Sequence, residues 1–208
     1  MSMRLFRDVR GSGAAEFVLV LPLLLILLFG IIDGGRWLWA YNEVTKATQA
    51  GARVAAVTKV IPAGLASTYI GITPPGATGA LTQGDLIPAS ALGLIRCVKP
   101  ASVVTCTCIT TPCPTVSTTS ALGWDAIVAR MKAMYSPISD TNVVVEYSGS
   151  GLGYAGDPDG QDISPLTTVR IQNLSFTPIT FLMLKSVQAI PAAAATYTAE
   201  DQLGTASN

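Results

Sequence analysis

Histidine is absent from the 208-residue sequence, and only 12% of the residues carry a charge. Because histidine is the commonest general base and metal ligand, its absence argues against Ser-His-Asp triads and histidine-based metal sites. Lysine and arginine together number 13, as do aspartate and glutamate, so no excess of positive charge points to nucleic acid. We therefore expect a protein that is not an enzyme, holds no cofactor and binds no nucleic acid.

Charge is missing entirely from one segment, residues 17–32. The apolar stretch around it, from Ala14 to Ile32, contains 19 residues. As a helix this stretch would be about 28 Å long, close to the ~30 Å hydrocarbon core of a bilayer. A cleaved secretory signal fits less well, because the apolar run is long and no A-x-A cleavage site follows it. We expect a membrane-spanning helix that is retained.

The residues on either side of this segment predict its orientation. Arg4, Arg7 and Arg10 precede it, whereas Asp33 and Arg36 follow it. By the positive-inside rule, the N-terminus lies in the cytoplasm and the bulk of the chain lies outside. Aromatic residues suited to the membrane interface come next, namely Trp37, Trp39 and Tyr41.

Glu16 is unusual because it lies near the start of the apolar segment. An acid within a membrane helix is costly, which makes it a candidate functional residue. The surrounding sequence, GSGAAEF from Gly11 to Phe17, matches the G-x-x-x-x-E-[YF] processing motif of prepilins. Together with LVLPLLLILLFGIIDGGR, which ends at Arg36, it resembles the TadE-like family of minor pseudopilins in tight-adherence (Flp-type) pilus systems.

The resemblance implies a processing site and an assembly residue. A prepilin peptidase would cut after Gly11, so that Ser12 becomes the N-terminus and Glu16, followed by Phe17, becomes the fifth residue. In pilin-like assemblies that glutamate pairs with the terminal amine of a neighbouring subunit, and a buried carboxylate that loses its partner is strongly destabilising. The implied partners are the peptidase, other pilins or pseudopilins, the pilus assembly platform and the lipid bilayer.

The implied function is that of a minor pilin or pseudopilin, a structural component of a pilus that supports adhesion or secretion. The implied location is the bacterial inner (cytoplasmic) membrane, with one span, a cytoplasmic N-terminus and a periplasmic or extracellular domain. Whether the chain enters the fibre is left open. The alternative is an uncleaved single-span envelope protein whose outer domain binds a partner, in which case Glu16 is incidental.

The whole sequence predicts an α+β fold of the pilin-like kind, in which a long N-terminal helix packs on a small antiparallel sheet. Past Gly34-Gly35, which favour a bend or a close backbone contact, the helix continues from Trp37 to Lys59. Its second half is rich in alanine and glycine, so a sheet can approach it closely. The predicted segments are a leader (1–11), a transmembrane helix (12–36), a periplasmic helix stem (37–60), a loop-rich insertion with the cysteines (61–119), and a helix plus antiparallel sheet of the same domain (120–208).

Periodicity and turn signals predict the other elements. Ser120–Tyr135 reads as an amphipathic helix that ends before Pro137. The apolar segment Pro178–Val187 reads as a core-facing loop or short helix, with a patch at the membrane surface or a subunit contact as the alternative. The predicted strands are Leu92–Val98, Val103–Ile109, Thr141–Ser148, Thr167–Phe176 and Ala192–Glu200.

All four cysteines lie in the insertion, at Cys97, Cys106, Cys108 and Cys113. An even number outside the membrane predicts two disulfides. A Cys106–Cys108 ring would be strained, which leaves Cys97–Cys106 with Cys108–Cys113, or Cys97–Cys108 with Cys106–Cys113. A zinc site is less favoured, because paired C-x-x-C units are absent and the compartment is oxidising.

Three carboxylates, those of Asp157, Asp159 and Asp162, cluster in a loop between two predicted strands. Calcium sites use such oxygen-rich loops, so these residues are a weak calcium candidate. The EF-hand pattern is incomplete, however, and no glutamate closes the loop. A solvated turn is the favoured interpretation, and no other metal site is expected.

Overall fold

The computed structural model describes residues 12–158, 160–180 and 187–201. The chain forms two compact units. We call them the anchor unit (Met1–Ala40 with Ser175–Ala189) and the sheet unit (Tyr41–Leu174 with Ile190–Asn208). One helix, α1 (Ser12–Val57), contributes residues to both units.

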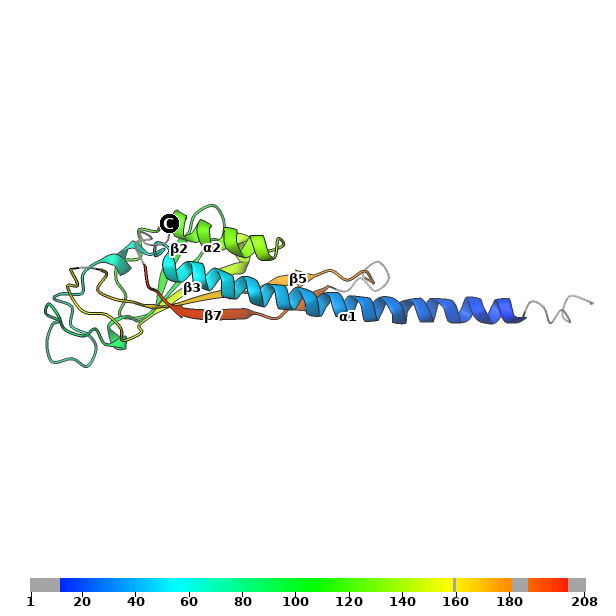
Figure 1. Cartoon of the computed structure of the whole chain (residues 1–208), viewed down its shortest axis with the longest axis horizontal. Coiled ribbons are helices and arrows are strands. Elements are labelled where there is room, and N and C mark those ends of the chain that lie inside the picture. Colours follow the sequence, from blue (N-terminus) through cyan, green and yellow to red (C-terminus); the bar gives the residue numbers. More distant parts are fainter. Residues whose placement is uncertain (1–11, 159, 181–186, 202–208) are drawn as a thin grey trace, which may run out of the picture. The chain divides into compact units, whose positions relative to one another are not determined.

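α1 is a single helix of 46 residues, drawn in blue and cyan in Figure 1. Leucine and alanine, two of the strongest helix formers, recur along it. The helix contains Pro22 and continues through Gly34 and Gly35 without interruption. A side chain at either glycine would meet no atom within 4 Å, so the close backbone contact expected there is not found among the described residues.

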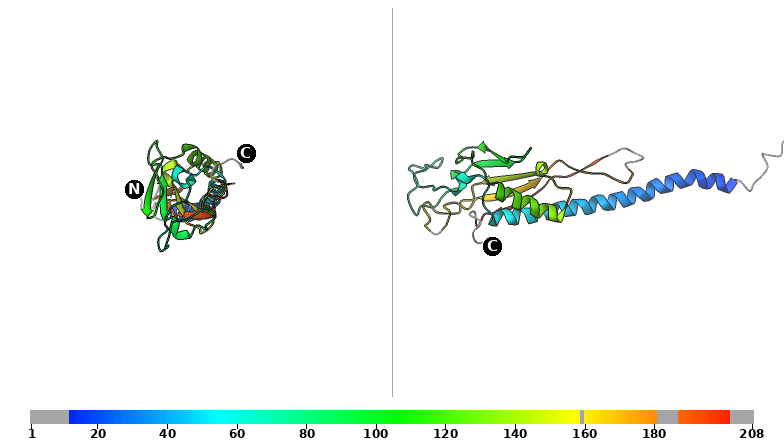
Figure 2. Two further views of the ribbon diagram at one scale, coloured as in Figure 1. Left: turned by 90° about the vertical axis from the view of Figure 1, so that its left-hand side faces the viewer. Right: turned by 90° about the horizontal axis from the view of Figure 1, so that it is seen from above.

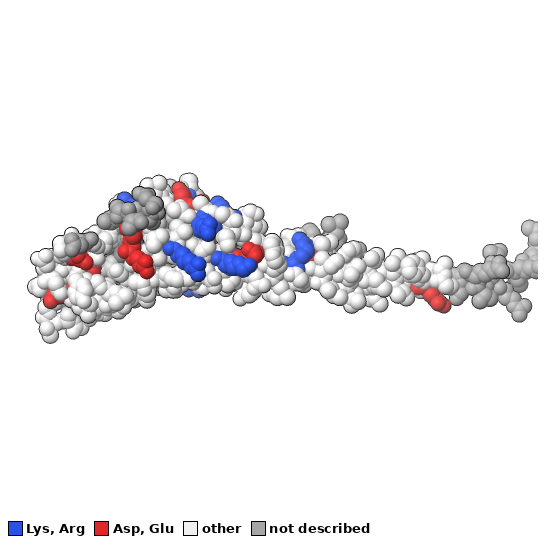
Figure 3. Space-filling view, in the orientation of Figure 1, with Lys and Arg blue, Asp and Glu red and all other residues white. Residues whose placement is uncertain are grey.

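The anchor unit exposes the apolar part of α1. Large side chains between Phe17 and Ile32 are mostly exposed, and Leu19 has 79% of its surface accessible. Within the described residues, α1 is the one helix long and apolar enough to cross a membrane, judged by length and composition. In Figure 3 this part of the helix presents a long stretch without charge. Apolar surface of this extent requires lipid or other apolar partners.

A two-stranded ribbon, β5 (Leu174–Phe176) and β6 (Gln188–Ile190), supplies the other part of the anchor unit. The predicted strand Thr167–Phe176 was too long, because Asn173 has a φ of 56°, in the left-handed region that interrupts a strand. β6 was not predicted. Most of the apolar segment Pro178–Val187 lies outside the described residues, which include its positions 178–180 and 187.

The sheet unit contains a five-stranded antiparallel sheet in the order β2-β1-β3-β4-β7. The α+β class, with a long N-terminal helix and an antiparallel sheet, is therefore confirmed. Three short 3₁₀ helices, η2 (Ala63–Ala66), η3 (Ala89–Ala91) and η4 (Asp140–Asn142), lie in the connections. The strands are β1 (Leu94–Val98), β2 (Thr105–Thr110), β3 (Val143–Ser148), β4 (Leu166–Ile171) and β7 (Ala193–Thr198).

The cysteine-containing segment 61–119 supplies part of this sheet in addition to loops. Its strands β1 and β2 form one edge, and β1 pairs with β3 from Ile95↔Tyr147 to Val98↔Val144. The first part of the segment is irregular and carries η2 and η3. The two strands were predicted to within two residues at each end, but their place in the sheet was not.

The core of the sheet unit lies between the sheet and two helices, the second part of α1 and α2 (Ala121–Met134). In both views of Figure 2, α2 (green) lies beside the cyan end of α1. Small residues permit close packing here, because an added Cβ at Gly51 of α1 would lie 2.6 Å from Met131 Cγ, and one at Gly123 of α2 would collide with the carbonyl of Lys59, which follows α1. The buried small residues of α1 are Ala47, Ala52, Ala55 and Ala56, and α2 buries Trp124, Ile127, Val128 and Met131.

Candidate functional site at the end of the apolar helix segment

The predicted processing residues lie at the beginning of α1. Gly11 is outside the described residues, and Ser12 is the first residue of the helix. Glu16 and Phe17 follow on an exposed part of α1, where Phe17 is 63% exposed. The roles of these four residues in cleavage and assembly stay predictions.

Asp33 is the first buried side chain along the described part of α1, with 7% of its surface exposed. It comes directly after the apolar segment that ends at Ile32. Because a buried charge is costly unless it is paired and hydrogen-bonded, a carboxylate at this position requires partners.

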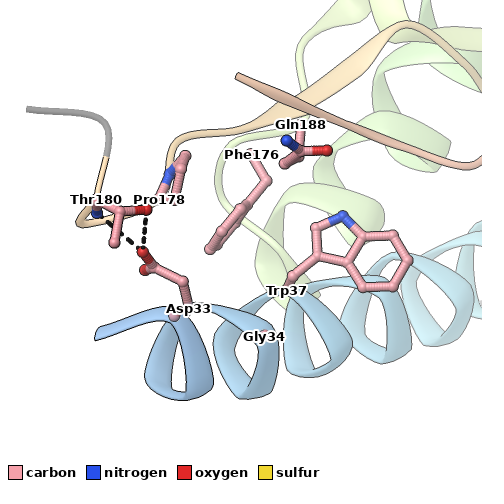
Figure 4. A pocket seen from close by; sticks show the side chains of 8 residues that line it. Asp33, Gly34, Trp37, Phe176, Pro178, Thr180 and Gln188 are labelled. Carbon is pink, nitrogen blue, oxygen red and sulfur yellow. Dashed lines mark hydrogen bonds between the residues drawn. The ribbon is translucent and has the colours of Figure 1, made fainter. Parts of the chain in front are cut away.

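The hydrogen-bond donors to Asp33 include Ile179 and Thr180, which follow β5 after two intervening residues. Its Oδ1 accepts a hydrogen bond from the backbone N–H of Ile179 at 2.7 Å. Its Oδ2 accepts from the backbone N–H and the hydroxyl of Thr180, at 2.9 Å and 2.8 Å. Figure 4 shows the side chain pointing from α1 to Thr180. We call this arrangement of Asp33, Ile179 and Thr180 the Asp33 clamp.

Arg36 balances the charge of the clamp. Its Nη1 lies 3.1 Å from Asp33 Oδ1, one helical turn away, and its side chain is 46% exposed. The guanidinium also lies over the ring of Phe176, 5.2 Å from the ring centroid, which is a cation–π geometry. Arg36 therefore links the carboxylate on α1 with the ribbon as well as neutralising it.

A groove of about 300 Å³ lies beside the clamp. One turn further along α1, Trp37 donates a hydrogen bond from Nε1 to the carbonyl of Ala189, at 3.4 Å. The helix thus contacts both sides of the ribbon's connection, through Asp33 to residues 179 and 180 after β5 and through Trp37 to Ala189 in β6. The groove is lined by Gly30, Asp33, Gly34, Trp37, Phe176, Pro178, Thr180 and Gln188.

The clamp is suited to holding α1 and residues 179 and 180 together. It is not arranged for a reaction in which covalent bonds form. Its carboxylate is occupied by three donors and one guanidinium, and a reacting group would have to displace them. Sequence reasoning identified Asp33 and Arg36 as the residues after the span but missed Thr180. A signal was present, because an acid that follows an apolar helix segment without a break must find donors elsewhere in the chain.

Two members of the calcium candidate lie in the described structure, Asp157 and Asp162, whereas Asp159 lies outside it. Asp162 Oδ2 accepts hydrogen bonds from the Thr68 hydroxyl and from the backbone N–H groups of Tyr69 and Gly156, at 2.9, 2.6 and 2.8 Å. Burial opposes ionisation of Asp162, but these bonds outweigh it and lower its pKa.

The Asp162 carboxylate therefore joins two loops, one that contains Thr68 and Tyr69 and one that contains Gly156. Burial, followed by the nearby Asp162 charge, raises the pKa of Tyr69 to about 12. In the described part of the chain, no three His, Cys, Asp or Glu side chains are grouped to hold a metal ion. With Asp159 undescribed, calcium binding by this loop stays an untested prediction.

The cysteines form Cys97–Cys106 and Cys108–Cys113, the first of the two pairings left open by the sequence. Sheet register explains the choice. Cys97 on β1 lies directly opposite Cys106 on β2, whereas Cys108 lies opposite Ile95. Directly opposite residues have the closest Cβ atoms. Cys108 then bonds to Cys113, which follows β2.

A second charged group lies on the sheet and was not predicted. Glu146 on β3 is 7% exposed and sits between two arginines from the neighbouring strands. Arg96 Nε lies 2.9 Å from Oε1, and Arg170 Nη2 lies 3.3 Å from Oε2. Single-strand periodicity gives no signal for such a cluster, because its members come from three strands.

One segment of the chain, which contains Asp33, matches a known protein family. Residues 11–53 match the family model described as TadE-like protein. No curated protein and no solved structure matches the chain. The family match confirms the resemblance drawn from the prepilin motif and the apolar segment, and it identifies residues 11–53 as the TadE-like segment of this chain.

Proposed function

We propose that this protein is a minor pseudopilin of a tight-adherence pilus system. The TadE-like segment and the apolar N-terminal helix fit a membrane-anchored component of such a pilus. The observation that carries the proposal is the composition of α1 itself. One uninterrupted helix begins with exposed apolar side chains and continues into small residues buried in an α+β domain. Such a helix anchors and supports a domain in one element.

In this proposal the chain is a structural component and not an enzyme. It is anchored in the inner membrane with its N-terminus in the cytoplasm and its sheet unit outside. Two disulfides support the outer location, because disulfides persist in oxidising compartments. Its contribution is to initiate or adjust pilus assembly and thereby to support adhesion or secretion.

Processing by a prepilin peptidase is the most specific part of the proposal. Cleavage after Gly11 makes Ser12 the mature N-terminus, and this residue is also where α1 begins. Glu16, four residues later, then pairs with the terminal amine of a neighbouring subunit. A carboxylate near the end of an apolar helix gains from such a partner, because its charge is otherwise poorly solvated in the membrane.

The mature N-terminus tests the processing step. The full chain is expressed with its pilus peptidase, and its N-terminal sequence and intact mass are measured after purification from membranes. We expect a chain that starts at Ser12, and a Gly11→Val variant that keeps the leader. Gly13→Ala is the matched control and should be cleaved normally, because Gly13 lies outside the invariant positions of the motif and a side chain there meets no atom within 4 Å.

A chain that retains Arg4 to Gly11 in the presence of the active peptidase would favour the alternative, an uncleaved single-span envelope protein whose outer domain binds a partner. A chain that starts after Trp39 would identify a cleaved secretory signal and would contradict both interpretations.

Glu16→Ala tests the assembly role separately from cleavage. We expect this variant to fold and to keep both disulfides, because Glu16 lies on the exposed part of α1, but to impair pilus formation. Glu43→Ala is a suitable control, since Glu43 lies on the same helix outside the processing motif and pairs with Lys46 at 3.1 Å. Normal pili with Glu16→Ala would contradict the pairing.

A further inference from the structure

We infer that Ile179 and Thr180, held by the Asp33 clamp, lie in the lipid headgroup region and give the protein a second contact with the bilayer. The partner is a lipid surface, and the contacting residues are Ile179 and Val187 with the groove beside Trp37. This inference rests on the membrane anchoring of α1, but cleavage at Gly11 and pilus assembly play no part in it.

The position of the clamp follows from the anchor unit alone. The apolar segment of α1 ends at Ile32, so Asp33 marks the boundary of the hydrocarbon region. Ile179 and Thr180 are hydrogen-bonded to the Asp33 carboxylate at 2.7 to 2.9 Å, so they lie at the same depth. The groove continues from Trp37 back to Gly30, which is inside the apolar segment.

The backbone N–H groups of Ile179 and Thr180 are satisfied in the way that a membrane boundary requires. Non-helical backbone is tolerated near hydrocarbon only where its N–H groups have partners within the protein. The carboxylate of Asp33 accepts from two consecutive N–H groups and from the Thr180 hydroxyl, and Thr180 itself is 8% exposed. Arg36 then neutralises the carboxylate.

Two apolar side chains remain exposed near the clamp, beside the exposed Arg36 and Gln188. Ile179 is 48% exposed and Val187 is 53% exposed, while the backbone N–H and hydroxyl of Thr180 point to Asp33 (Figure 4). Trp37 lines the groove, and tryptophan is enriched at membrane interfaces. Ile179 is bonded to Asp33 and the groove extends to Gly30, so both adjoin the end of the apolar segment of α1 and the bilayer that surrounds the span reaches them.

Depth measurement on the full chain in phosphatidylethanolamine–phosphatidylglycerol vesicles tests the inference. A nitroxide is attached to Ile179→Cys, which is selective because all four native cysteines are in disulfides. The rate at which the nitroxide collides with oxygen is compared with the rate at which it collides with a water-soluble nickel complex. Leu24→Cys, in the middle of the apolar segment, gives the lipid reference, and a free water-soluble nitroxide gives the aqueous reference.

We expect the ratio of the two collision rates at the Ile179 label to lie between those of the lipid and aqueous references, which corresponds to headgroup depth. In the Asp33→Ala background this ratio should shift to the aqueous value. The Leu24 label should not move in that background, and an unchanged disulfide pattern shows that the sheet unit is intact. If the Ile179 label is in water while the Leu24 label is in lipid, the inference is wrong but the membrane insertion of α1 is still supported. An aqueous Leu24 label overturns the anchor itself, and with it the inference.

A label at Ile179 that keeps its headgroup depth with Asp33→Ala would overturn the role of the clamp. Thr180→Val provides the graded control. It removes only the hydroxyl bond to Asp33 and leaves both backbone bonds, so the label should shift less than with Asp33→Ala.

Discussion

The carboxylate of Asp33 binds the backbone and hydroxyl of Thr180, a residue 147 positions further along the chain. This contact joins the TadE-like segment to a part of the sequence that the family model does not cover. The residue that follows the apolar segment therefore has a structural partner within its own chain.

Replacing Asp33 with Asn should release the segment after β5. The amide side chain can accept only on its oxygen, so at least one of the three bonds from Ile179 and Thr180 is lost, together with the ion pair to Arg36. We expect faster hydrogen exchange at the amides of residues 179 and 180 by mass spectrometry of the chain in nanodiscs. Exchange in β3 should not change. Equal protection at residues 179 and 180 in the variant would show that the ribbon is held by other contacts.

Two glycines at the interface of α1 and α2 should respond differently to alanine. In Gly123→Ala the new methyl group meets the rigid Lys59 carbonyl, so we expect the free energy of unfolding to fall by about 1–3 kcal/mol. In Gly51→Ala it meets the flexible Met131 side chain, and alanine's better helix propensity offsets the cost, so we expect a change within about 1 kcal/mol. Denaturant unfolding of the full chain in detergent measures both. Equal losses would mean that the backbone near Lys59 adapts as readily as Met131.

The two disulfides should each stabilise the sheet unit. Chain-entropy arguments for loops of this size give about 2–3 kcal/mol per disulfide. Cys97→Ala with Cys106→Ala should cost more than Cys108→Ala with Cys113→Ala, because Cys97 is fully buried and its removal also leaves a cavity. Partial reduction with stepwise alkylation checks the pairing. A Cys97–Cys108 product would contradict the register of β1 and β2.

Asp162 should make stability depend on pH in the acid range. Its pKa is lowered below the ordinary value of 3.8 in the folded chain, so the unfolded chain binds the proton first as the pH falls. The stabilisation is therefore complete above about pH 5 and is lost as the pH falls through the folded value. Relative to Asp162→Asn, the wild type should be more stable by about 1–3 kcal/mol at pH 7, and this advantage should be smaller at pH 2.

Asp125→Asn controls for the general effect of removing a carboxylate. Asp125 is 59% exposed in its pair with Lys99, and surface pairs contribute about 1 kcal/mol or less. A difference between wild type and Asp162→Asn that is the same at both pH values would show that the Asp162 hydrogen bonds do not depend on its charge.

The helices and most strands of this protein could be predicted from short-range patterns in its sequence. The apolar segment, the prepilin motif and α2 are recognised from consecutive residues, because a helix needs only its own hydrogen bonds and a one-sided apolar face. The family match over residues 11–53 lies in this same part of the chain. The strands were also recognised, apart from the break at Asn173, where one residue takes a left-handed φ, and β6, which was not predicted.

Only the tertiary structure decided which distant residues meet. The disulfide pairing depends on the register between β1 and β2, and the cluster of Glu146 with Arg96 and Arg170 depends on the order of three strands. The Asp33 clamp depends on the ribbon returning to α1. The sequence by itself determined that the chain has an apolar helix followed by an acid. The sequence could not show that Thr180 is the partner of this acid. A carboxylate accepts hydrogen bonds from any donor, and only tertiary packing brings a particular donor within 3 Å of it.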